Sequence, residues 1–148
     1  HTPAPVLPVP YETEEEENGK TRTKTKYKVL VVEDDEDIRR YICRELASDY
    51  HTLESCNGKE ALESIFNKTP DLVISDVMMP EMDGIQATGI IRAMKRPDAA
   101  TVPIIAMTAN AYPEDSMRAR NYGMNEHLPK PISQQKLIEI VLKVLSKN

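Results

Sequence analysis

The sequence predicts an α/β fold in which an open, parallel, five-stranded sheet carries helices on both faces. Short apolar runs at residues 29–32, 71–75 and 103–107 are continuous rather than alternating, which is typical of strands covered on both sides. Segments with helical periodicity lie between these runs, and repeated β-then-α units build an open parallel sheet. Two weaker strand candidates, residues 50–55 and 126–129, complete the expected set.

The expected helices follow from apolar spacing and from capping residues. Asn57 is a candidate N-cap, with Glu60 three residues further on. A third helix is expected to begin near Asp83, although Gly89 inside it costs about 1 kcal/mol relative to alanine. The apolar faces of the first, second and last helices are Ile38, Tyr41, Ile42 and Leu46; Ala61, Leu62, Ile65 and Phe66; and Leu137, Ile140, Val141, Val144 and Leu145.

The fourth helix is expected between two residues that favour helix ends. Pro113 suits a first helical turn and Gly123 suits the position just after a helix. The last helix is expected to start after Ser133 and to have a wider apolar surface than one core face needs. We therefore expect Ile138 or Leu142 to contact a helical partner or a second copy of the chain.

Composition limits the class of protein. A chain of 148 residues fits one domain, and a net charge of -5 argues against nucleic acid as a direct partner. Two cysteines are too few for a disulfide framework, which favours a cytoplasmic setting. No apolar run approaches the roughly 20 residues of a membrane span, so no membrane contact is expected. The chain opens at His1 without an apolar signal segment, and we expect a piece of a longer protein.

Residues 1–27 differ in composition from residues 28–148, which are expected to form the domain. PAPVLPVP is rich in proline and is followed by the acids Glu14–Glu17 and by the alternating TRTKTK. Such segments bury little apolar surface and are typical of mobile tails. The sequence therefore predicts a flexible interdomain linker over residues 1–27.

Acidic and other polar residues follow the expected strands. Glu33 and Asp34 follow the first strand, Asp76 the third, Thr108 the fourth and Lys130 the fifth. In an open parallel sheet these carboxyl ends meet at one crevice, where ligands bind. Clustered carboxylates cannot all stay ionised without a cation, and oxygen ligands without histidine or cysteine favour Mg²⁺. Asp35, Glu36 and Asp37 are expected in the first turn of the next helix, where acids interact well with the helix dipole.

The chain resembles the receiver domains of two-component signalling (response regulator, CheY-like family) over residues 27–147. Four segments carry the resemblance in the family's order: VLVVEDDEDIR, DLVISDVMMPEMDG, PIIAMTANA and HLPKPI. The resemblance implies a doubly wound, flavodoxin-like fold with strand order 2-1-3-4-5. It also implies that the domain takes a phosphoryl group from a phosphohistidine, with Mg²⁺, and then changes conformation.

Roles carried over from the family fall on particular residues. Asp76 matches the phosphoacceptor, Asp34 the direct metal ligand, and Glu33 its acidic neighbour, where the family more often has Asp. Met78 matches the position whose backbone carbonyl binds the metal. Thr108 and Lys130 match the hydroxyl and the ammonium that meet the phosphoryl group, and Pro131 the proline after a cis peptide. His127 stands at the aromatic switch position, a departure from Tyr or Phe that predicts weaker or pH-dependent coupling.

Two other classes compete for the same residues. A Mg²⁺-dependent phosphatase of the haloacid dehalogenase type needs a second aspartate two residues after the nucleophile, and Met78 stands there. A nucleotide-binding module needs a glycine-rich phosphate loop of the G-x-G-x-x-G or G-x-x-x-x-G-K-[ST] kind, and neither pattern occurs.

The receiver resemblance extends to the parent protein. GMNEHLPKPI and PIIAMTANA are most similar to receivers of hybrid histidine kinases, with a stand-alone or DNA-binding regulator as the alternative. The chain itself is expected to be a phosphoacceptor that assists its own phosphorylation, since it carries no kinase motif. Expected partners are the helices of a histidine kinase or of a histidine phosphotransfer protein, and the expected location is cytoplasmic, including the cytoplasmic side of a membrane-bound parent.

Overall fold

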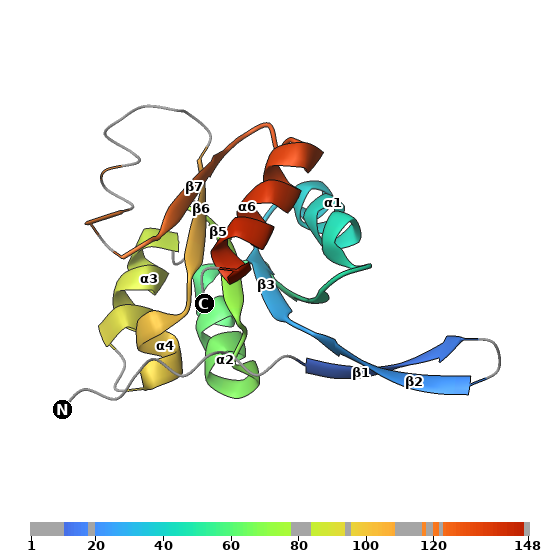
Figure 1. Ribbon diagram of the computed structural model, residues 1–148. Coiled ribbons are helices and arrows are strands. Elements are labelled where there is room, and N and C mark those ends of the chain that lie inside the picture. The colour runs from blue at the N-terminus through green and yellow to red at the C-terminus, as the bar shows by residue number, and fades with distance from the viewer. Residues whose placement is uncertain are drawn as a thin grey trace.

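Five parallel strands form a sheet in the order β4-β3-β5-β6-β7 (Figure 1). The computed structural model describes residues 11–17, 20–77, 84–93, 96–108, 117, 120, 121 and 123–146. Counted along the chain within this sheet, the order is 2-1-3-4-5, which confirms the predicted fold class. The strands are β3 (Lys28–Val32), β4 (His51–Ser55), β5 (Leu72–Asp76), β6 (Ile104–Thr108) and β7 (Glu126–Pro129).

Helices cover both faces of this sheet. Four expected helices are present: α1 (Glu36–Leu46), α2 (Gly58–Lys68), α3 (Gly84–Ala93) and α6 (Gln134–Ser146). The short α4 (Pro97–Thr101) was not expected from the sequence. The helix predicted after Pro113 falls on a segment that lies mostly outside the described residues.

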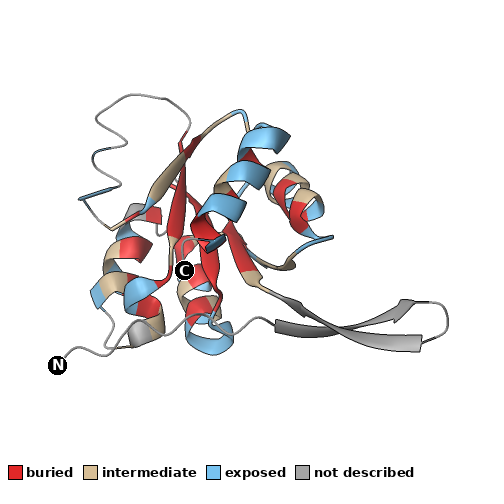
Figure 2. Ribbon diagram, viewed as in Figure 1, coloured by how far each residue is buried: buried red, intermediate tan, exposed pale blue. Residues whose placement is uncertain are grey.

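The hydrophobic core has two halves, one on each face of the sheet (Figure 2). Alternate residues of β3 belong to different halves: Val29 and Val31 pack with α1 and α6, while Leu30 and Val32 pack with α2, α3 and α4. All four side chains are fully buried. This two-sided burial explains why the strands are continuous apolar runs.

Two helices begin where the sequence places a capping side chain. Asn57 Oδ1 accepts a hydrogen bond from the Glu60 backbone N–H at 2.8 Å, as expected. Asp35 is the N-cap of α1 rather than a residue of its first turn, and its Oδ1 accepts from the Asp37 and Ile38 N–H groups at 2.9 and 3.1 Å. The cap starts α1 directly after the acids that end β3.

The apolar face of α2 differs from prediction, whereas that of α6 agrees with it. Phe66 is 61% exposed on α2 rather than buried. The guanidinium of Arg96 lies 4.9 Å from its ring centroid, which gives the ring a cation–π contact at the surface. On α6, Leu145 is buried, whereas Ile138 and Leu142 are 42% and 59% exposed. The apolar surface of α6 that lies outside the core therefore consists of these two side chains.

Residues 11–17 and 20–26 form a separate antiparallel ribbon of β1 (Tyr11–Glu17) and β2 (Lys20–Lys26). Two strands therefore lie within residues 1–27, and the interdomain linker expected over this range stays a prediction. The register places Glu15 opposite Arg22 and Glu17 opposite Lys20. Opposite charges and threonines in cross-strand positions favour such pairing, and Asn-Gly between the strands is a hairpin signal in the sequence. The boundary between linker and domain stays a prediction.

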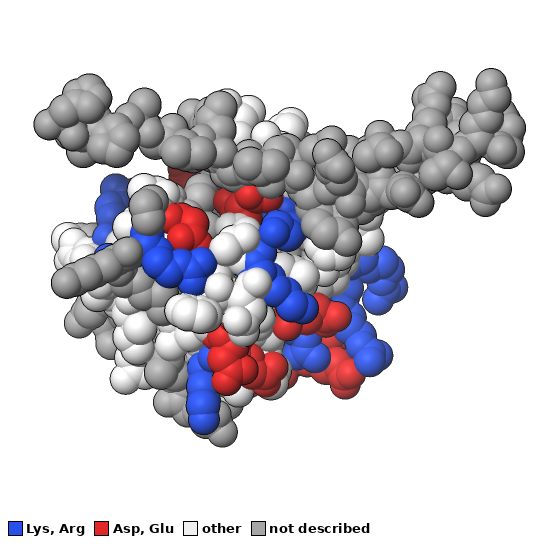
Figure 3. All heavy atoms as spheres, turned by 90° about the horizontal axis from the view of Figure 1, so that it is seen from below, with Lys and Arg blue, Asp and Glu red and all other residues white. Residues whose placement is uncertain are grey.

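The distribution of charge on the surface bears on nucleic acid as a partner, and the length of the helices bears on membranes. Among the described residues, acidic and basic side chains lie intermingled on the face seen in Figure 3. Among the residues that the structure describes, no helix is both long and apolar enough to cross a membrane.

Gly123 supplies a backbone conformation that other residues rarely adopt. Its φ is +105°, and its N–H donates to the Arg120 carbonyl at 3.0 Å, in keeping with the expected position after a helix. A Cβ at this position would lie 2.9 Å from Cγ of Arg92. Arg92 donates hydrogen bonds to the Gly123 carbonyl at 2.9 and 3.1 Å, so crowding there would disturb the link between α3 and β7.

We predict that Gly123→Ala lowers the free energy of unfolding by about 1–2 kcal/mol, because alanine is strained at positive φ. Urea denaturation measures the change. The control is Gly89→Ala inside α3, which should raise the stability by up to about 1 kcal/mol, because alanine is the better helix former. Equal effects of the two substitutions would contradict the prediction.

Candidate functional site

The predicted site residues meet at the carboxyl edge of the sheet. Glu33 and Asp34 follow β3, Asp76 ends β5, Thr108 ends β6 and Lys130 follows β7. The strand order reverses between β3 and β5, whose ends carry the three carboxylates. The topology therefore brings together side chains that are separated by up to 97 positions in the sequence.

Lys130 connects two buried carboxylates. Its Nζ lies 3.1 Å from Glu33 Oε1 and 3.1 Å from Asp76 Oδ2. Glu33 is 1% exposed and Asp76 is 6% exposed, so neither charge is well hydrated. An ammonium between two such carboxylates offsets part of their desolvation and of their mutual repulsion. The lysine follows the fifth strand into a cis Lys130–Pro131 peptide, as the resemblance implied.

The acids remain hard to ionise together. Burial and, to a lesser degree, the neighbouring Asp76 raise the pKa of Glu33 to about 7, although Lys130 partly opposes the rise. Burial by itself would lower the pKa of Lys130, but the charges of Asp76 and Glu33 outweigh burial and raise it. The site therefore holds more negative charge than one lysine neutralises.

The three carboxylates could hold a metal ion. One oxygen from each of Glu33, Asp34 and Asp76 lies within 4.8 Å of the other two, and Asp34 is exposed to solvent. Oxygen donors at such spacing, with one face open to water, fit a hard divalent cation such as Mg²⁺. The excess negative charge favours such an ion on electrostatic grounds. Met78, the predicted carbonyl donor, lies outside the described residues.

Thr108 is buried and has an imidazole as its partner. Its hydroxyl is hydrogen-bonded to Nε2 of His127, a residue of β7. The register pairs Ala106 with His127, and Thr108 lies two residues beyond Ala106 on the same face of the sheet. Asp76 is paired with Met107, so Thr108 lies one residue beyond the partner of the candidate phosphoacceptor. The structure thus joins Thr108 to the residue that stands at the predicted switch position.

Sequence reasoning missed two residues that shape the site. A Cβ at Gly84 would lie 2.1 Å from the Asp76 carbonyl oxygen and 2.7 Å from Ser75 Oγ, so only glycine lets α3 begin this close to β5. Arg39 of α1 donates a hydrogen bond to the Glu33 carbonyl at 2.8 Å. Both residues belong to the quoted family segments, but their roles depend on contacts that the chain makes only when folded.

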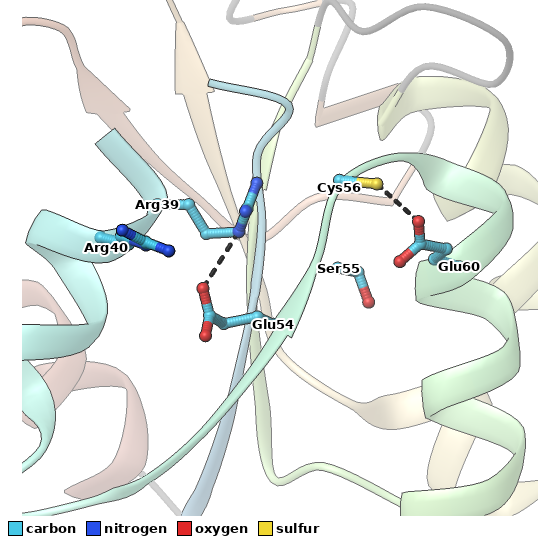
Figure 4. Close-up of a pocket in the computed structure, with 6 residues that line it drawn as sticks. All are labelled: Arg39, Arg40, Glu54, Ser55, Cys56 and Glu60. Carbon is cyan, nitrogen blue, oxygen red and sulfur yellow. Dashed lines mark hydrogen bonds and ion pairs between the residues drawn. The ribbon is translucent and has the colours of Figure 1, made fainter. Parts of the chain in front are cut away.

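A pocket of about 260 Å³ lies beside this site, between α1 and α2 (Figure 4). None of the three clustered carboxylates lines it. The pocket contains Cys56, whose thiol donates to a Glu60 carboxylate oxygen. That hydrogen bond raises the pKa of Cys56, which disfavours a reactive thiolate. The lining residues are Arg39, Arg40, Glu54, Ser55, Cys56 and Glu60.

Comparison with known proteins defines the class. Residues 29–142 match the response regulator receiver domain, and the chain belongs to this family. The polar-differentiation response regulator DivK of Brucella anthropi is 36% identical over 120 residues, which cover 79% of this chain and 94% of DivK. The hybrid signal transduction histidine kinase D of Dictyostelium discoideum is 30% identical over 118 residues, which cover 80% of this chain but 8% of that kinase.

Solved structures agree with the fold. The receiver domain of a sensor histidine kinase from Pseudomonas aeruginosa PAO1 superposes with a TM-score of 0.75 at 32% identity, covering 82% of this chain and 99% of that domain. That structure has a magnesium ion coordinated in the active site cleft. The chain is therefore a receiver domain of two-component signalling, a class that interacts with histidine kinases or phosphotransfer proteins.

The raised pKa of Glu33 predicts a pH dependence of stability in metal-free buffer. Between its ordinary pKa of 4.5 and its folded pKa of about 7, the folded state holds a proton that the unfolded state releases. The contribution of Glu33 to stability is therefore present at low pH and is lost as pH rises through this window. Glu33→Gln should make the loss of stability with rising pH less steep.

Urea denaturation of both proteins at about pH 5, 6 and 7, with a chelator present, measures the difference in slope. The control is Glu63→Gln, the same chemical change at an exposed position of α2. If Glu33→Gln has the pH slope of the unsubstituted protein, the assigned ionisation is wrong.

Proposed function

We propose that Asp76 is the phosphoacceptor of this receiver domain and that Mg²⁺ binds at Glu33, Asp34 and Asp76. The observation that carries the proposal is the buried group of Glu33, Asp76 and Lys130 beside the exposed Asp34. This group has a nucleophile, a cation and a set of oxygen donors at one edge of the sheet. Phosphoryl transfer depends mostly on such positioning and charge neutralisation.

The proposed reaction transfers a phosphoryl group from a phosphohistidine to the Asp76 carboxylate. A carboxylate oxygen attacks phosphorus, the phosphorus–nitrogen bond breaks, and the electron pair returns to the imidazole of the donor. The product is an acyl phosphate on Asp76, a covalent intermediate that serves as the signal. A bound Mg²⁺ would supply charge neutralisation for the phosphoryl oxygens.

Lys130 and Thr108 are proposed to meet the new phosphoryl group. Lys130 Nζ already lies 3.1 Å from Asp76 Oδ2, so a small movement brings it to a phosphoryl oxygen on that carboxylate. The Thr108 hydroxyl is engaged by His127 and has to leave this partner to reach the same group. Phosphorylation would thereby exchange one hydrogen bond of Thr108 for another, which makes His127 part of the switch.

The proposed parent is a hybrid sensor histidine kinase with this domain on the cytoplasmic side. Support comes from the likeness to receiver domains of two histidine kinases. A stand-alone regulator is the second candidate, favoured by the match to nearly the whole length of DivK. In either setting the proposed partners are helices that carry the phosphohistidine. The exposed Ile138 and Leu142 of α6 are the proposed contact for a helical partner or a second copy.

The first prediction concerns the acceptor. Acetyl phosphate with Mg²⁺ should add one phosphoryl group to the unsubstituted protein and none to Asp76→Asn, as measured by intact mass. Asp34→Ala should slow labelling because a metal ligand is lost, whereas Asp37→Ala should not, since Asp37 lies in the first turn of α1. Labelling that persists in Asp76→Asn would show that another residue is the acceptor.

A further prediction concerns the switch. The ring signals of His127 in NMR spectra should move when beryllofluoride, a phosphoryl mimic, binds together with Mg²⁺, because Thr108 would then leave its hydrogen bond to the ring. His51 begins β4 at the other end of the strands and should not respond, which makes it an internal control. A response of Thr108 without one at His127 would limit the switch to Thr108.

A further inference from the structure

Arg39 holds the backbone of the candidate metal site. It lies in the second turn of α1, and its guanidinium makes two contacts that belong to different strands. Nη1 donates to the Glu33 carbonyl oxygen at 2.8 Å, and Nε donates to Glu54 Oε1 at 3.0 Å. The Arg39 side chain is 15% exposed, so its contacts are shielded from water more than those of a surface arginine. Charge-assisted hydrogen bonds of this kind are among the stronger ones in proteins.

The first contact completes the anchoring of Glu33. The Glu33 N–H donates to the Ser55 carbonyl of β4 at 3.0 Å, and its carbonyl accepts from Arg39. Because the peptide group is planar, fixing the Glu33 carbonyl also fixes the N–H of Asp34. Arg39 thereby helps to set the position from which the Asp34 side chain leaves the backbone.

The second contact orients the guanidinium. Figure 4 shows Arg39 extending from α1 to Glu54 on β4. The Glu54 carboxylate thereby holds one edge of the planar guanidinium. A guanidinium can donate through Nε and Nη1 at the same time in a fixed geometry, whereas a lysine ammonium cannot reproduce this fork. Arg40, the next residue, pairs instead with Glu36 on the same helix and is 66% exposed. The two adjacent arginines therefore have different environments and form a matched pair for comparison.

We propose that Arg39 is a positioning residue for metal binding, which fixes the Glu33–Asp34 peptide so that Asp34 and Glu33 face the ion together. The proposal rests on the proposed function, in which these acids hold Mg²⁺. Replacing a residue that positions a metal ligand through a hydrogen bond typically changes the affinity for the metal by about 10–100-fold. If Arg39 only linked α1 to β4, its replacement would lower the stability of the fold and leave the affinity for Mg²⁺ unchanged.

The test measures Mg²⁺ binding alone, by isothermal titration calorimetry of the full chain well below its unfolding temperature. Arg39→Met keeps the apolar stem and removes the guanidinium, and it should weaken Mg²⁺ binding roughly tenfold or more. Arg39→Lys should give an intermediate affinity, since an ammonium can serve only one of the two acceptors well. Arg40→Ala should bind Mg²⁺ like the unsubstituted protein. Unfolding in metal-free urea, measured in parallel, reports the structural part of each change.

The outcomes separate this proposal from the proposed function. Asp34→Ala is the reference for a lost ligand. If Asp34→Ala loses Mg²⁺ binding but a folded Arg39 variant keeps the affinity of the unsubstituted protein, the positioning role is overturned and the metal site stands. If the unsubstituted protein itself binds no Mg²⁺, both proposals fail. Backbone amide signals of Glu33 and Asp34 that shift in Arg39→Lys, but not in Arg40→Ala, would add direct support for the geometry.

Discussion

The ion pairs of one lysine with two buried carboxylates organise the carboxyl edge of the sheet. Lys130 follows β7, whereas Glu33 follows β3 and Asp76 ends β5, so the contacts pass across β6 and join the ends of strands that are not neighbours. Removing the lysine would leave two poorly hydrated carboxylates facing each other, which is costly in a protein interior. The negative charge at this edge is costly to bury, and the same charge attracts a divalent cation. Stability and function therefore depend on one local charge balance.

Most of the fold could be predicted because the strands of a doubly wound sheet are buried on both sides. Continuous apolar runs such as Val29–Val32 are uncommon outside such strands, and the helices between them have regular apolar spacing. The exceptions have physical causes. The helix α4 is five residues long, too short for periodicity to show. Phe66 is at the surface, where the Arg96 guanidinium contacts its ring. The strands β1 and β2 were not expected, because the blocks of charge in residues 11–26 are typical of a solvated tail.

The site was predictable to the extent that its residues directly follow strands. Glu33, Asp34, Asp76, Thr108 and Lys130 lie at strand ends, and topology alone brings them to one edge. Contacts made by helices were not predictable in this way. Arg39 is one of several charged residues in an acidic and basic stretch, and nothing in its spacing shows that it reaches the Glu33 carbonyl. Gly84 could be noted as a glycine, but its close approach to the Asp76 carbonyl depends on how α3 meets β5. The hydrogen bond between Thr108 and His127 depends on the register of β6 and β7.

Only Tyr27 separates the ribbon strand β2 from the central strand β3. A load that acts on β2 is therefore passed on to β3 through a single residue. Because β3 has a parallel neighbour on each side, such a load acts in shear on two ladders of hydrogen bonds at once and does not open them one by one. The far end of this strand carries Glu33 and Asp34. A load that reaches β3 therefore acts on the strand that leads directly to the acids proposed to bind the metal.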